Sequence, residues 1–331
     1  MARTLAEIAK SINIAKSSVQ NRPQRIFLCG GPLPEKGGAA PTSLRAVLMV
    51  LLQKDHANLR SRIILAEDAA KWYHSPNSPD FPNLVDLENQ IAALSTLILL
   101  IVESAGSIAE LGAFSFIPSL RAKLSVVLES RYQSRHSFIM DGPVAMVEKE
   151  CNEKGKPSRW YAFDWLRKTK EPVFSPSQAL KAAKKIIEEI LYPAIKKNRN
   201  SETFHANNLE HQILLVADLV AVSGPLLIHE IMEMIGGLDL MTEREIEQKN
   251  VEGFLFLLEK LGHLTKTRAG NYDFYVPSKT DTNFISYLSA AGKSIKWERL
   301  AADISKIIPN LPGFEYRKAA YKSAPKMKVA R

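Results

Sequence analysis

The segment Val102-Glu-Ser-Ala-Gly-Ser-Ile-Ala-Glu-Leu-Gly-Ala-Phe114 carries the residue types best suited to chemistry on a glycosidic bond. Its first residue, Val102, ends an apolar run typical of a buried strand, and Glu110 lies in the first turns of the next predicted helix. In doubly wound sheets this is the ligand-binding face, and it lies near the positive end of a helix. An ionised carboxylate there can attack the anomeric carbon of a sugar and displace its base. The alternative is that Glu110 only complements the helix dipole.

Several other polar residues and glycines lie at the ends of predicted strands, and Glu88 lies on the predicted helix that precedes the strand at 97–102. Carboxylates suit the hydroxyl groups of a sugar, which offer hydrogen-bond donors. For Glu88 and Glu103 the alternative is an ordinary structural or exposed charge. The predicted substrate-binding residues are Gly30, Gly31, Glu67, Glu88, Glu103, Ser104 and Gly106.

The elements that must position these residues alternate between strand and helix. A long polar loop with three prolines is expected after residue 67. The alternation predicts an α/β fold with a doubly wound, flavodoxin-like parallel sheet. The predicted strands are 25–31, 62–67, 97–102, 123–128 and 160–163, and the predicted helices are 44–53, 86–94, 108–115 and 176–190.

The pattern changes after a polar linker at 196–202. Two helices broken by glycines, a longer helix at 243–261 and a hairpin at 262–276 predict a winged-helix domain. A further helix is expected at 295–308, ahead of a basic C-terminal tail. The predicted organisation is an N-terminal helix at 1–24, an α/β domain at 25–200, the winged helix at 205–278 and a helical, basic tail at 279–331.

Composition narrows the class of protein. The chain of 331 residues is 46% hydrophobic, which excludes disorder throughout. Its longest apolar run, about 12 residues, is shorter than the roughly 20 that a membrane-spanning helix needs. The two cysteines, Cys29 and Cys151, fit neither a disulfide framework nor a metal site, and the first residues lack a secretory signal pattern. We therefore expect a cytoplasmic protein without a metal or a membrane partner.

The formal net charge of +9 points to a polyanionic partner. Residues 313–331 hold six basic residues and one acid, with Tyr316 and Tyr321 among them. The helix at 243–261 is rich in glutamate, which argues against insertion into a DNA groove and leaves open a protein-binding role. The predicted nucleic-acid contacts are Arg244, Lys249, Lys266, Arg268, Arg317, Lys318 and Lys322.

Residues 25 to about 130 resemble the nucleoside 2-deoxyribosyltransferase family. The likeness rests on a strand ending in glycines, an acidic residue about eight before a strand, and the Gly-x-x-x-Glu-Leu-Gly helix start. The resemblance implies that Glu110 is the nucleophile of N-glycosidic cleavage. It also places Glu88 and Ser104, with Glu103 beside it, where that family has ligand-binding aspartates.

Nearly the whole chain resembles a narrower group, the retron-associated effectors with such a domain and a C-terminal winged helix. The carrying segments are Ile26-Phe-Leu-Cys-Gly-Gly31, Ile64-Leu-Ala-Glu-Asp68, Leu87-Glu-Asn-Gln-Ile-Ala92 and Val102 to Phe114. The resemblance implies a toxin of an antiphage system, partnered by a reverse transcriptase and its branched RNA–DNA. It further implies NAD as a substrate rather than a cofactor, cleaved at the nicotinamide–ribose bond, and assembly into a homo-oligomer or larger complex.

Two other functions remain open at this point. The chain could be a DNA-binding regulator whose α/β domain senses a nucleotide without turnover, or an enzyme that transfers deoxyribose between nucleosides. Release of nicotinamide from NAD would distinguish an NAD-hydrolysing enzyme from both of these alternatives.

Overall fold

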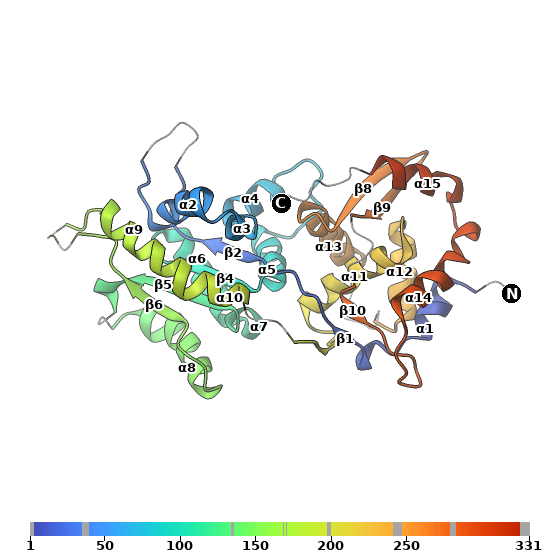
Figure 1. Cartoon of the computed structure of the whole chain (residues 1–331), viewed down its shortest axis with the longest axis horizontal. Helices are drawn as coiled ribbons and strands as arrows, with labels where there is room; N and C mark the ends of the chain where they lie inside the picture. Colours follow the sequence, from blue (N-terminus) through green and yellow to red (C-terminus); the bar gives the residue numbers. More distant parts are fainter. Residues whose placement is uncertain are drawn as a thin grey trace. The chain divides into compact units, whose positions relative to one another are not determined.

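The contacts within the chain define two compact units, which are described separately below (Figure 1). The sheet unit comprises Pro23–Lys71 and Ile91–Asn198, and the C-terminal unit comprises Met1–Arg22, Trp72–Gln90 and Arg199–Arg331. The segment from Trp72 to Gln90 thus belongs with the C-terminal unit, although it lies between two strands of the sheet in the sequence. The computed structural model describes residues 3–34, 40–133, 136–167, 169, 171–196, 200–240, 247–278 and 283–324.

A parallel sheet forms the centre of the sheet unit. In the described residues this sheet has five strands in the order β3-β2-β4-β5-β6. The chain passes from β2 to β3 on one side and then crosses back to place β4 on the other side of β2, so the topological switch point lies between β2 and β4. This confirms the prediction of an α/β fold with a parallel sheet. The strands are β2 (Ile26–Cys29), β3 (Ile63–Leu65), β4 (Leu97–Ile101), β5 (Leu124–Glu129) and β6 (Trp160–Phe163).

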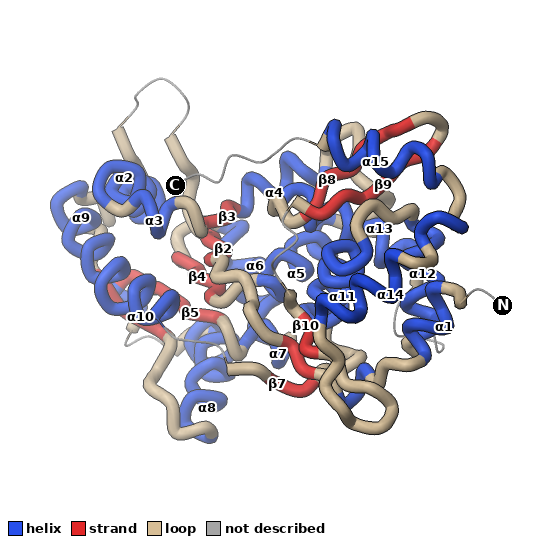
Figure 2. Tube along the Cα trace, turned by 45° about the vertical axis from the view of Figure 1, so that its right-hand side comes forward, coloured by secondary structure: helices blue, strands red, loops and turns tan. Residues whose placement is uncertain are grey.

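Helices flank this sheet, and four of its strands are buried along their whole length. Helices α2 and α9 lie on one side of the strands and α6 on the other (Figure 2). Leu28 and Leu99 pack in one apolar cluster with residues of α2 and α9, while the ring centroid of Phe27 lies 6.1 Å from that of Phe114 on α6. Continuous apolar runs are therefore required in these strands. The helices are α2 (Leu44–Asp55), α3 (Ala57–Arg60), α4 (Ala66–Tyr73), α5 (Leu84–Leu94), α6 (Ala105–Phe116), α7 (Pro118–Arg121), α8 (Ala145–Glu153), α9 (Pro176–Lys185) and α10 (Tyr192–Lys196), with π-helical turns at Met140–Val144 and Ile186–Leu191 and a 3₁₀ turn at Ser130–Tyr132.

Helices α4 and α6 differ from the sequence-based prediction near the end of the sheet. Helix α4 occupies Ala66–Tyr73, where a loop is predicted, because Glu67 and Asp68 stabilise its first turn and Asp68 Oδ2 accepts a hydrogen bond from the Leu65 N–H at 3.2 Å. Helix α6 begins at Ala105, three residues earlier than the predicted start at residue 108. Glu110 consequently lies in the second turn of α6, beyond the region where the helix dipole acts most strongly.

In the C-terminal unit, the described residues between 209 and 277 form three helices followed by an antiparallel hairpin, in the predicted order. Helix α11 is buried along almost its entire length and forms the centre of the unit. Helix α13 is described from Gln248, and its predicted first residues, 243–246, lie outside the described residues. The elements are α1 (Leu5–Lys10), a 3₁₀ turn at Ile14–Lys16, β1 (Ser18–Val19), β7 (Glu202–Thr203), α11 (Leu209–Ser223), α12 (Ile228–Gly237), α13 (Gln248–Lys260), β8 (Leu264–Ala269), β9 (Tyr272–Pro277), β10 (Ile285–Ser286), α14 (Trp297–Ser305), a 3₁₀ turn at Ile308–Asn310 and α15 (Phe314–Ser323).

A buried aspartate joins α11 to a small sheet in this unit. Strand β1 pairs with β7 on one side and β10 on the other. Asp218 Oδ1 accepts hydrogen bonds from the N–H groups of Phe284, at 2.5 Å, and Ile285, at 3.2 Å. Burial raises the pKa of Asp218 to about 7, although these hydrogen bonds oppose the shift. Among the described residues, no helix is both long and apolar enough to cross a membrane.

Part of the predicted basic tail is a packed helix rather than an exposed segment. Arg317 on α15 is 4% exposed, and its guanidinium forms an ion pair with Glu230, which is 1% exposed. The same guanidinium donates to the carbonyl oxygens of Pro225 and Pro312, and it lies 5.1 Å from the ring centroid of Phe274. The prediction that Arg317 contacts nucleic acid therefore conflicts with its position inside the unit, where it holds α15 against α12.

We predict that Arg317→Met destabilises the C-terminal unit by about 3–5 kcal/mol, because it leaves the Glu230 carboxylate buried without a partner. Lys318→Met, at the exposed neighbouring position of α15, is the matched control and should change stability little. Urea unfolding of both variants measures the effect. Equal unfolding midpoints for the two variants would contradict this role of Arg317.

Candidate functional site

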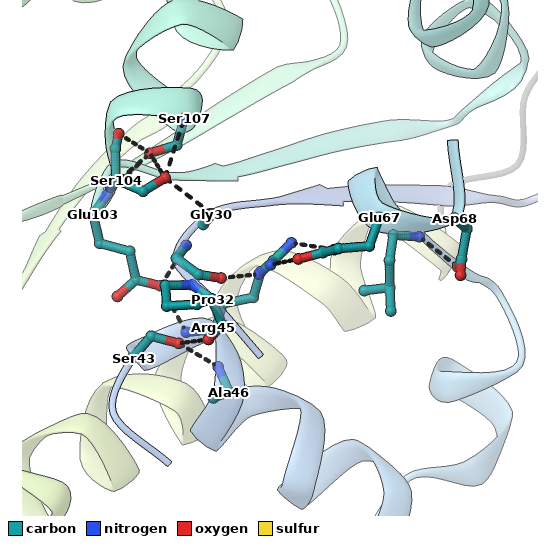
Figure 3. A network of polar contacts seen from close by, with 12 residues as sticks. Gly30, Pro32, Ser43, Arg45, Ala46, Glu67, Asp68, Glu103, Ser104 and Ser107 are labelled. Atoms are coloured by element: carbon teal, nitrogen blue, oxygen red, sulfur yellow. Dashed lines mark hydrogen bonds and ion pairs between the residues drawn. The ribbon is translucent and has the colours of Figure 1, made fainter. Parts of the chain in front are cut away.

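The carboxylate of Glu103 ties the end of β4 to the turn after β2 and to the start of α2 (Figure 3). Oε1 accepts hydrogen bonds from the N–H groups of Gly31 and Arg45, both at 3.0 Å, and Oε2 accepts from the Leu44 N–H at 2.8 Å. Burial raises the pKa of Glu103, while these backbone hydrogen bonds and the Arg45 charge oppose the shift. The carboxylate thus satisfies backbone donors that the first turn of a helix otherwise leaves unpaired.

Glycine at position 31 is required by this close approach. A Cβ atom added to Gly31 would lie 2.7 Å from Cγ of Glu103, which is closer than such contacts occur. The glycine turn was predicted as a substrate contact. At Gly31 the space left by the missing side chain is occupied by the side chain of Glu103.

Arg45 is a site residue that the sequence-based reasoning missed. It is 2% exposed, its Nε donates to the Gly31 carbonyl at 2.6 Å, and its NH1 donates to Glu67 Oε2 at 3.0 Å (Figure 3). A second hydrogen bond joins NH2 to Glu67 Oε1. Glu67 therefore influences the turn after β2 indirectly, by holding the Arg45 side chain that bonds to the Gly31 carbonyl. The signal for Arg45 in the sequence is a lone arginine in the otherwise apolar first turns of a predicted helix.

Ser104 is the N-cap of α6. Its Oγ accepts a hydrogen bond from the Ser107 N–H at 3.1 Å and donates to the Gly30 carbonyl at 3.2 Å, while Ser107 Oγ accepts from the Ser104 N–H at 3.0 Å. This reciprocal capping explains why the helix begins at Ala105. It also fixes the direction in which α6 carries Glu110.

A pocket of about 490 Å³ lies at the carboxyl ends of β4 and β5. Glu103 and Ser104 line it, together with residues that follow β5 and β6. Ligands of open α/β sheets bind at this position, so the pocket is the best candidate for a substrate site. Its lining also includes two charged residues that the sequence-based prediction did not name, Glu129 and Arg131.

The remaining predicted substrate residues lie elsewhere. Glu110 is half-buried on α6, whose first turn lines the pocket, but Glu110 and Gly106 are not among the described residues of the lining. Glu88 belongs to the C-terminal unit, where burial raises its pKa to about 7. Among the described residues, no cluster of three or more His, Cys, Asp or Glu side chains could hold a metal ion.

The basic residues predicted to bind nucleic acid differ in whether neighbouring carboxylates neutralise their charges. Lys249 pairs with Glu247 at 2.8 Å, and Lys266 pairs with Asp273 at 3.3 Å. A cavity of about 610 Å³ between α13 and the β8–β9 hairpin has Lys266 and Arg268 in its lining together with the carboxylates of Glu252, Glu259 and Asp273. Burial and these three acids raise the pKa of Tyr275 in the same cavity to about 12.

Lys318 and Lys322 have a different environment. Both are exposed on α15, and they lie one turn apart on the same face of the helix. The side chains of Phe314 and Tyr321 on this helix are 47% and 48% exposed. Arg244 lies outside the described residues.

Fold and site define an α/β protein with a pocket at the end of a parallel sheet, mostly apolar in its lining and with a few charged side chains, joined to a helical unit that ends in a hairpin and α15. The family model of the STM3845 retron effector protein matches residues 41–266, which is more than half of the chain. The chain therefore belongs to this family of retron effectors.

Two curated relatives from Escherichia coli support this assignment. The chain is 24% identical over 221 residues to the "Retron Ec73 putative ribosyltransferase/DNA-binding protein", a match that covers 63% of this chain and 65% of that protein. It is 43% identical over 127 residues to the "Retron Ec86 putative ribosyltransferase/DNA-binding protein", covering 38% of this chain and 37% of that protein. In both comparisons the match spans less than two thirds of the relative.

We predict that Glu103→Gln lowers the stability of the sheet unit by roughly 2–4 kcal/mol, because an amide cannot present two acceptor oxygens to three backbone N–H donors. Glu188→Gln, at an exposed position of the same unit, is the control. Thermal and urea unfolding measure the change. Wild-type stability of Glu103→Gln would show that the carboxylate does not hold the turn and α2 together.

Proposed function

We propose that the chain is the toxic enzyme of a retron antiphage system and hydrolyses NAD at the nicotinamide–ribose bond. The observation that carries the proposal is the segment from Ser104 to Glu110. It begins at the carboxyl end of β4, the first turn of its helix lines the pocket, and its helix carries a half-buried glutamate. Membership of the retron effector family and the ribosyltransferase names of the two relatives support the same chemistry.

The chemistry asks little of the protein beyond a carboxylate. Nicotinamide is cationic in NAD and leaves as a neutral base, so its departure needs little help from a general acid. Glu110 stabilises the oxocarbenium-like transition state or forms a glycosyl adduct, as carboxylates do in other glycosidases. Water then completes the reaction, and the products are nicotinamide, ADP-ribose and a proton.

The C-terminal unit would connect the enzyme to the other retron components. We interpret α11, α12, α13 and the β8–β9 hairpin as the winged helix, and the sheet unit as the flavodoxin-like domain. A reverse transcriptase and its branched RNA–DNA are the proposed partners that restrain the enzyme, in a homo-oligomer or larger assembly. The nucleic acid would contact Lys318 and Lys322 on α15, because the carboxylates beside Lys266 and Arg268 oppose phosphate binding at the hairpin.

We predict that Glu110→Gln lowers nicotinamide release from NAD by roughly a thousand-fold or more, because the amide carries no negative charge. Chromatography of nicotinamide released by the purified full-length protein measures this rate. Glu153→Gln on α8, where the side chain is 63% exposed, is the matched control and should keep wild-type activity.

Three outcomes would contradict parts of this proposal. Undiminished hydrolysis by a folded Glu110→Gln variant would remove Glu110 from the mechanism. Binding of NAD without any release of nicotinamide would favour a nucleotide-sensing regulator, and base exchange with deoxynucleosides would favour deoxyribosyl transfer.

We predict that Lys318→Gln combined with Lys322→Gln weakens binding to a labelled DNA duplex and reduces the salt slope of log K by about 2, since about one counterion is released per phosphate contact. Fluorescence anisotropy at several salt concentrations measures both quantities. The matched control pairs Lys266→Gln with Arg268→Gln at the hairpin. A larger loss in this control than in the α15 variant would place the contact at the hairpin instead.

A further inference from the structure

Arg131 is held in place where the chain leaves β5. Glu129, the last residue of that strand, is 2% exposed, and its Oε2 accepts a hydrogen bond from the Arg131 N–H at 2.9 Å. The guanidinium lies 4.6 Å from the ring centroid of Tyr132, and its NH2 donates to the Tyr132 hydroxyl at 2.6 Å. Three contacts from two neighbouring side chains therefore restrict the position of this cation.

The hydrogen-bonding capacity of the guanidinium is only partly used. Its Nε lies 3.5 Å from Glu129 Oε2, close enough for an ion pair, but this buried N–H has no hydrogen-bond acceptor among the described residues. This buried N–H therefore faces Glu129, and the other donors of the guanidinium, whose side chain is 32% exposed, are the ones that can reach a ligand in the pocket. Arg131 is also the single cation among the described residues that line the pocket.

The charges around the pocket leave Arg131 as its anion-binding group. The Glu103 carboxylate is compensated by three backbone N–H donors and by the nearby Arg45. Glu129 Oε2 accepts a hydrogen bond from the Arg131 backbone N–H and pairs with Nε of the guanidinium, which leaves the other guanidinium nitrogens of Arg131 for a ligand in the pocket. A guanidinium presents several donors in a fixed plane, and this geometry matches the oxygens of a phosphate group.

We propose that Arg131 binds a phosphate of the substrate and thereby selects nucleotides over free nucleosides, with Glu129 and Tyr132 as its positioning residues. The inference rests on the proposed function for the identity of the nucleotide, NAD. It adds a specificity-determining residue, which lies after β5 rather than on α6. A pocket built for nucleosides alone would have no use for a cation held in this way.

Arg131→Met tests this inference in the purified full-length protein. The ratio of kcat/KM for NAD to kcat/KM for nicotinamide riboside, which lacks phosphate, should fall about 10- to 100-fold, as expected for loss of a charged hydrogen bond. The fall should come from a higher KM for NAD, with kcat nearly unchanged. Arg131→Lys should restore part of the ratio, and Arg299→Met, at an exposed position of the other unit, should leave it unchanged.

Equal effects on both substrates, or no effect on either, would overturn the role of Arg131. A binding measurement separates this result from failure of the proposed hydrolysis. In calorimetry with Glu110→Gln protein, ADP-ribose should bind more tightly than adenosine, and Arg131→Met should abolish the difference. An Arg131-dependent preference, together with wild-type protein that releases no nicotinamide from NAD, would retain this inference and reject NAD hydrolysis. Absence of the preference would reject the inference even if NAD is hydrolysed.

Discussion

The hydrogen bonds of one buried carboxylate set the geometry at the end of the sheet. Glu103 links β4 to the glycine turn after β2 and to the first turn of α2, and Gly31 leaves the space that this link requires. The adjacent Ser104 caps α6 and bonds back to the same turn. Because three segments meet at this point, the wall of the pocket and the direction of α6 are fixed together. Glu103 is consequently a structural residue at the edge of the site, and Arg45 extends its network to α4 through Glu67.

This arrangement assigns different tasks to the charged residues at one end of the sheet. Glu103, Arg45 and Glu67 satisfy one another and the backbone, so their charges are largely used within the protein. Glu129 and Arg131 interact more loosely with each other and face the pocket. In the proposed reaction Glu110 provides the chemistry and Arg131 the recognition of phosphate. A site of this kind separates the group that acts at the sugar from the group that recognises the nucleotide.

The fold was predictable from sequence where local patterns are strong, and the site only in part. The apolar run at Leu97–Ile101 predicts the buried strand that forms there, whereas Ser104 was not recognised as the cap of α6 and the helix start was placed three residues late. The interaction partners of individual side chains were harder to predict from the sequence, because they depend on contacts between segments that are distant along the chain. Glu103 reads as a ligand contact in the sequence, yet its oxygens accept from Gly31, Leu44 and Arg45. Arg317 reads as part of an exposed basic tail, yet it pairs with a glutamate 87 positions away. Glu129 and Arg131 carry no recognisable motif, and only the pairing of β5 with its neighbours brings them to the pocket.

The NAD concentration in cells that carry the complete retron tests the central claim most directly, because it keeps the effector with its partners. We expect NAD to fall sharply after phage infection when the effector is wild type, and to stay at its starting level when the effector carries Glu110→Gln. NAD that stays constant while the wild-type system arrests infected cells would contradict NAD hydrolysis as the toxic activity. NAD that falls equally with the Glu110→Gln effector would contradict the role of Glu110.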